Sequence, residues 1–159
     1  VCLDYYYRAA TIENLWKLNR ISETCAKGAA MAAGTTVEWS QRYPDYGEIY
    51  WNAYMDEIMQ ELFSDTGRAT VRSKGPGGST DLGNVNLKIP VFHPMIDITG
   101  SRKDIVIHDR EFERLLHTEA AAEVLRDGAY IIAGLGYKLA SEPEVMERIK
   151  EDHRKYRNL

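Results

Sequence analysis

The stretch YYYRAATIENLWKLNRISETCAKGAAMAAGTTVEW, residues 5–39, decides the fold that the sequence predicts. Aromatic and β-branched residues are concentrated in residues 1–8 and again in residues 35–42, a composition typical of strands. Between these two segments, apolar residues recur at helical spacing, with Thr11 in the N-cap position and Gly34 at the expected end. Strand, helix and strand in this order make half of a split β-α-β unit of the ferredoxin-like kind.

The rest of the chain repeats the same two kinds of pattern. Ser141 stands three residues before Glu144, a capping-box spacing that predicts the start of a last helix. Residues 99–110 are polar and are expected to form a loop. The helices predicted by apolar periodicity cover residues 48–63, 117–140 and 141–156. The further predicted strands cover residues 69–73 and 87–98. The expected fold class is therefore α/β.

Composition excludes several classes of function. The chain has 159 residues, a net charge of -4 and a pI near 5.6, which argues against a nucleic-acid partner because phosphate binding needs clustered Lys and Arg. It has no apolar run long enough to cross a membrane, and no signal peptide pattern. Cys2 and Cys25 each stand in an apolar pattern, so we expect buried free thiols and a cytoplasmic location.

The first residues also carry an expectation about the length of the protein. The sequence begins without Met, inside what reads as a strand, and its first third makes only half of a β-α-β unit. We therefore expect a further, N-terminal part.

The loop GGSTDLGNVNLKIPVFHP, residues 77–94, is the stretch most open to a functional interpretation. A P-loop would have Lys and Ser or Thr directly after its last glycine, and Asp81 would repel a phosphate, so a nucleotide site is disfavoured. Two alternatives remain. The loop is a tight turn in which glycines take positive φ, or it is a ligand-binding loop.

The four histidines offer few metal ligands. They do not form an HExxH motif, and no Ser/His/Asp triad can be assembled from the spacing. His153 is expected at the surface of a charged helix and His117 near a helix start. His93 and His108 are harder to dismiss, since His93 ends an apolar run and His108 lies in a loop after another one.

Four stretches together resemble the C-terminal half of the dinuclear-zinc aminoacylase and carboxypeptidase family. The closest branch is that of p-aminobenzoyl-glutamate hydrolase and peptidase-like amidohydrolases. The stretches are residues 5–39, YWNAYMDEIMQEL, the loop of residues 77–94, and HDREF with the C-terminal SEPEVMERIKEDH. The resemblance implies that residues 1–45 belong to a lid or dimerisation domain, and residues 46–159 to the C-terminal part of a catalytic domain.

The resemblance also implies roles for particular residues. His108 matches the family's last metal-ligand histidine, although the altered spacing of residues 113–117 leaves His117 as an alternative. Gly78 and Ser79 fall where the family's loop meets the substrate carboxylate, and Asp81 where an acidic residue supports that loop. His93 is a substrate-side or structural candidate.

The implied reaction is hydrolysis of an amide bond in an N-acyl amino acid, a dipeptide or an aminobenzoyl-glutamate-like substrate. In such enzymes two zinc ions, or manganese or cobalt, activate water, and a Glu takes the proton. The other metal ligands and the Glu precede the lid in this family, and none is found here, so no catalytic residue is assigned. We expect an enzyme fragment that is inactive alone, works with an N-terminal half and forms a homodimer through the lid. A carboxylate-binding or assembly module and one half of a split enzyme remain alternatives.

Overall fold

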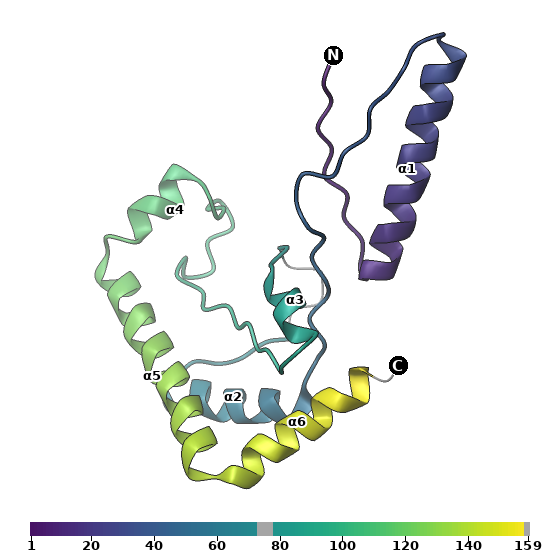
Figure 1. Ribbon diagram of the computed structural model, residues 1–159. Helices are drawn as coiled ribbons and strands as arrows, with labels where there is room; N and C mark the ends of the chain where they lie inside the picture. The colour runs from purple at the N-terminus through teal and green to yellow at the C-terminus, as the bar shows by residue number, and fades with distance from the viewer. Residues whose placement is uncertain (73–77, 158–159) are drawn as a thin grey trace. The chain divides into compact units, whose positions relative to one another are not determined.

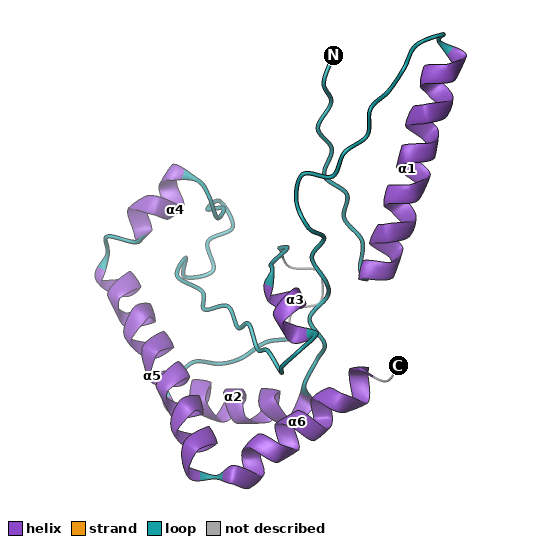
Figure 2. Ribbon diagram, viewed as in Figure 1, coloured by secondary structure: helices purple, strands orange, loops and turns teal. Residues whose placement is uncertain are grey.

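The computed structural model describes residues 1–72 and 78–157. The regular secondary structure in these residues is helical, and loops connect the helices (Figure 1). Its helices are α1 (Ile12–Ala32), α2 (Ala53–Asp65), α3 (Leu82–Asn86), α4 (Arg110–Leu115), α5 (Glu119–Ser141) and α6 (Pro143–Arg157). The described ranges contain no β-strand (Figure 2).

The predicted α/β class, with its half of a ferredoxin-like β-α-β domain, is therefore wrong. Residues 1–8, 35–42 and 87–98 form no sheet, nor do residues 69–72; residue 73 lies outside the described part. A strand needs a row of backbone hydrogen bonds to a neighbour, and strand-like composition alone does not supply one. The aromatic residues behind this prediction stack instead, with ring centroids 6.2 Å apart for Tyr5 and Tyr7 and 6.4 Å for Tyr7 and Trp39.

The predicted helices are present, with shifted ends. Thr11 caps α1 as expected, since its side chain accepts a hydrogen bond from the Asn14 backbone N–H. α2 begins later than predicted, because Asn52 is its N-cap. The prediction that Ser141 caps the last helix is wrong: Ser141 ends α5, where its hydroxyl donates to the Tyr137 carbonyl. α6 starts at Pro143, a residue suited to the first turn because it has no N–H to satisfy.

Two compact units divide the chain. Unit 1 consists of Val1–Tyr50 and Ser73–Val91, and unit 2 of Trp51–Arg72 and Phe92–Leu159. In unit 2, α2, α5 and α6 pack against one another. Its core is apolar and comes from all three helices; it consists of Met55, Ile58, Met59, Leu62, Phe63, Ile131, Val145 and Ile149. Burying each of these side chains contributes roughly 1.5–3 kcal/mol to folding.

Polar side chains fix the start of α2 against α6 within unit 2. The Asn52 side-chain oxygen accepts from the Met55 N–H, while its amide nitrogen donates to the Ile149 carbonyl at 2.8 Å. Asp152 of α6 accepts from the Ala53 N–H at 2.8 Å. Two donors that a helix start leaves unpaired are thus satisfied, one of them by a residue distant in sequence.

Unit 1 contains α1, α3 and the segment of residues 45–50. Glu48 accepts a hydrogen bond from the backbone N–H of Ile12, at the start of α1. Gly83 of α3 lies so close to Gly47 that a Cβ on Gly83 would sit 1.7 Å from the Gly47 carbonyl oxygen. Both contacts connect segment 45–50 with the rest of unit 1.

Two expectations about burial are wrong. Cys2 and Cys25 are exposed free thiols, because α1 buries none of its residues and residues 1–6 are exposed. His153 is 4% exposed, because it lies on the face of α6 that also carries the buried Ile149. No helix in the described ranges has the length and apolar character needed to cross a membrane.

Candidate functional site

The loop of residues 78–81 carries a contact that the sequence did not reveal. Arg8 donates a hydrogen bond from Nη1 to the Ser79 hydroxyl oxygen, with the two atoms 2.5 Å apart. Both side chains are exposed to solvent. Arg8 is the only basic residue among the first sixteen, and this isolation is the signal that could have drawn attention to it. The pair places a cation beside a predicted substrate-binding residue.

The neighbouring loop residues continue into α3. Thr80 accepts a hydrogen bond from the Leu82 N–H at 3.3 Å. Asp81 occupies the N-cap position of α3, but its exposed carboxylate makes no capping hydrogen bond. Its charge therefore remains on the loop surface, close in sequence to Ser79.

Gly78 does not act as the positive-φ turn residue that one interpretation of the loop requires. Positive φ is found among the described glycines at Gly34, Gly67 and Gly100 instead. Space around Gly78 is open, since no atom lies within 4 Å of the place where a Cβ would stand. Gly77 lies outside the described residues.

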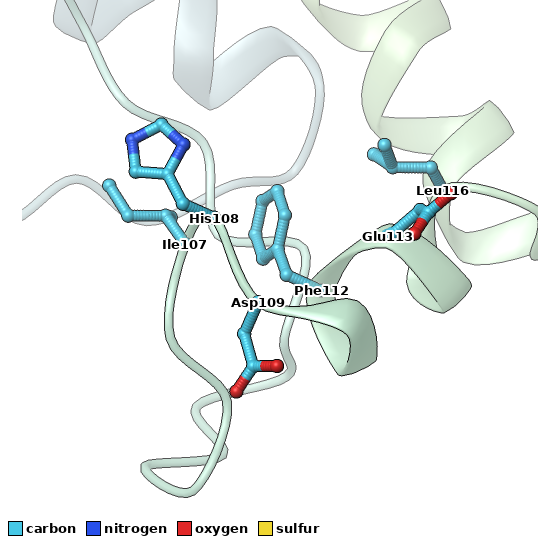
Figure 3. Close-up of a pocket in the computed structure, with 6 residues that line it drawn as sticks. All are labelled: Ile107, His108, Asp109, Phe112, Glu113 and Leu116. Carbon is cyan, nitrogen blue, oxygen red and sulfur yellow. The ribbon is translucent and has the colours of Figure 1, made fainter.

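The second candidate region is a hollow of about 490 Å³ in unit 2 (Figure 3). It is lined by Ile107, His108, Asp109, Phe112, Glu113 and Leu116. His108 has φ +72°, in the left-handed region that a residue with a side chain seldom adopts. Asp109 caps α4 by accepting from the Arg110 N–H. Its carboxylate points away from the His108 ring in Figure 3, so these two possible ligands do not converge.

A metal site is not assembled within the described residues. No group of three or more His, Cys, Asp or Glu side chains there is arranged to hold an ion. The predicted ligand His108 and its alternative His117 are both exposed, and so is His93. Zinc in proteins usually has at least three protein ligands, so the residues described do not by themselves fit the two-zinc site that the resemblance implies.

The predicted site residues fall into different units. Gly78, Ser79 and Asp81 belong to unit 1, whereas His93 and His108 belong to unit 2. Gly78, Ser79 and Asp81 lie together in the loop of unit 1, and Arg8 joins them through its hydrogen bond to Ser79.

No protein-family model matches this chain. Among curated proteins, it is similar to the Xaa-Arg dipeptidase of Homo sapiens, with 30% identity over 155 residues. This match covers 94% of the chain and 35% of the human protein. The Xaa-Arg dipeptidase of Mus musculus is 27% identical over 154 residues, with 94% and 35% covered. The chain thus spans about a third of the length of these relatives, whose names agree with the hydrolase class that the resemblance implies.

Proposed function

We propose that this chain is part of a dipeptide-cleaving hydrolase and that Arg8 and Ser79 bind the terminal carboxylate of its substrate. The hydrogen bond between Arg8 and Ser79 is the observation that carries this proposal. The similarity to two Xaa-Arg dipeptidases supports the class of substrate.

The chemistry of the pair suits a carboxylate. A guanidinium has five N–H donors in a planar fork, and the bond to Ser79 uses one of them. The Ser79 oxygen accepts from Arg8, so its own O–H is free to donate to a ligand. A substrate ending in arginine also carries a guanidinium, for which Asp81, with a carboxylate not engaged in capping, is the acceptor we assign.

This chain is assigned substrate binding and orientation, and no bond-breaking step. That this chain is a fragment which is inactive alone stays a prediction from the resemblance. Several further features stay predictions from the resemblance. They are metal dependence with His108 as one ligand, a lid in residues 1–45 and a catalytic part in residues 46–159. They also include a homodimer through the lid and a cytoplasmic location.

Calorimetric titration with alanyl-arginine and with its C-terminal amide tests the carboxylate site. We expect the chain to bind the acid and to bind the amide at least tenfold more weakly, because a hydrogen bond to a charged group contributes about 1.5–3 kcal/mol. Arg8→Ala should cause a similar loss for the acid. Arg20→Ala, which removes an exposed arginine of α1, is the matched control and should bind normally. Equal binding of acid and amide would disprove the proposal.

A non-catalytic carboxylate-binding module is the second candidate, because the contact between Arg8 and Ser79 requires no metal. Two experiments distinguish the enzyme from the binding module. The first is the same titration in the presence of a chelator. The second is a hydrolysis assay with zinc and a polypeptide that supplies the rest of a dipeptidase. Hydrolysis that depends on both additions supports the enzyme. Binding without hydrolysis in a folded mixture supports the module.

A further inference from the structure

We propose that segment 45–50 and α3 form a clamp that sets the position of Ser79 relative to Arg8, with Asn84 as the positioning residue. This inference rests on the proposed carboxylate site and names a residue that supports it without touching the ligand.

The Asn84 side chain binds segment 45–50 as a neighbouring strand's peptide group would. Its Oδ1 accepts from the Gly47 N–H at 2.8 Å, and its Nδ2 donates to the Asp45 carbonyl at 3.0 Å. One side-chain amide therefore satisfies a backbone donor and a backbone acceptor of the same segment. Because α3 follows directly after the loop of residues 78–81, fixing Asn84 also fixes the end of that loop.

Asn86 binds the C-terminal end of segment 45–50, at Tyr50. It is fully buried, with 0% of its surface exposed. Its Oδ1 accepts from the Tyr50 N–H at 2.6 Å, and its Nδ2 contacts the Ile89 carbonyl at 3.4 Å. Leaving a buried amide group unpaired costs about 1–3 kcal/mol, so α3 has one strongly preferred register on the segment.

Backbone contact completes this side of the clamp. The place where a Cβ of Gly83 would stand lies 1.7 Å from the Gly47 carbonyl oxygen, and the same place on Gly47 lies 3.4 Å from the Asn84 Oδ1. The two backbones can approach this closely only because residue 83 has no side chain.

The other side of the clamp leads to Arg8. Glu48 Oε2 accepts from the backbone N–H of Ile12 at 2.9 Å, which ties segment 45–50 to the first turn of α1. Arg8 lies in the chain just before that turn. Segment 45–50 is thus bonded on one side to the element that follows Arg8 and on the other to the element that follows Ser79.

Asn84→Ala tests the clamp in a double-mutant cycle with Arg8→Ala. We expect Asn84→Ala to weaken alanyl-arginine binding at least threefold in the otherwise unchanged chain and to have no further effect in the Arg8→Ala background. Asn84→Asp keeps the acceptor for Gly47 and should retain part of the affinity. Val85→Ala, in the same helix but 41% exposed, is the matched control and should bind normally. Equal effects of Asn84→Ala in both backgrounds would overturn the proposal, because they would indicate general destabilisation.

A spectroscopic measurement separates failure of the clamp from failure of the proposed function. The NMR signals of the Arg8 Nε–H and the Ser79 amide should shift in Asn84→Ala and not in Val85→Ala, with or without a ligand. If the unchanged chain does not bind alanyl-arginine but these signals shift, the clamp stands and the proposed function fails. If the signals do not move, the clamp is disproved whatever the binding result.

Discussion

At the scale of single residues, Asp97 organises the turn that follows it. Its carboxylate accepts from the Thr99 hydroxyl and the Thr99 N–H, both at 2.7 Å, and from the Ser101 N–H at 2.7 Å. Ser101 has positive φ, which these bonds help to maintain. Donation from the Thr99 hydroxyl, then from the Thr99 and Ser101 backbones, lowers the pKa of Asp97 below its usual value. The charged carboxylate is therefore the form that the turn prefers.

We predict that this turn loosens in acid. The pKa of Asp97 is lower in the folded chain than in the unfolded chain, where it is about 4. The charged carboxylate therefore stabilises the turn fully above the unfolded pKa, and this stabilisation is lost as the pH falls through the folded pKa. The Thr99 and Ser101 amide NMR signals should titrate together with a midpoint below 4. In Asp97→Asn they should be independent of pH in that range. A midpoint above 4 would contradict the sign of the effect.

At the scale of the helices, the starts of α5 and α6 are built differently. Thr118 caps α5, since its hydroxyl accepts from the Ala121 N–H at 3.3 Å. Ser141, which the capping-box spacing marked as a cap, instead bonds back to the Tyr137 carbonyl from the end of α5. Glu142 alone separates the two helices, and Pro143 is the first residue of α6.

Alanine substitutions should separate the two hydroxyls. Thr118→Ala is expected to lower the free energy of unfolding by about 1 kcal/mol, because it removes an N-cap. Ser141→Ala should change it by less than about 0.5 kcal/mol, because no helix start depends on that side chain. Urea unfolding followed by circular dichroism measures both. A larger loss for Ser141→Ala would restore the capping-box interpretation.

Elements were predictable from the sequence where their determinants are local. The periodicity around Thr11 and the long stretch that forms α5 indicate helices correctly, because neighbours in the sequence are also neighbours on a helix. The start of α2 was misplaced because Asn52 is fixed by the Ile149 carbonyl, a partner 97 residues away. The strand predictions failed because a strand also needs a hydrogen-bonded neighbour, which residue composition alone does not specify. Arg8 was missed because its bond to Ser79 spans 71 residues.

At the scale of the whole molecule, the described core belongs to unit 2. Ile131 is 1% exposed at the centre of that core, while its neighbour Ile132 is 73% exposed. The same side chain thus occurs at adjacent positions of α5 in opposite surroundings. Adjacent positions of a helix differ by about 100° in direction, which is why one faces α2 and the other does not.

Ile131→Ala should destabilise unit 2 by about 2–5 kcal/mol through the cavity it leaves. Ile132→Ala, the matched control, should cost less than about 0.5 kcal/mol. Native-state hydrogen exchange provides the measurement. Protection of the α2 and α6 amides should fall in the first variant, and that of the Gly47 amide, in unit 1, should not. Equal losses in both variants would show that the buried and exposed positions are wrongly assigned.

The close approach of Gly83 to Gly47 restricts how this chain can evolve. Any single-base change that replaces glycine at position 83 introduces at least a Cβ, and that atom would overlap the Gly47 carbonyl oxygen. Even the smallest substitution, to alanine, is therefore not tolerated at this position unless the neighbouring backbone moves first. In a lineage under selection for this fold, position 83 should behave as fixed, while exposed Val85 nearby is free to vary.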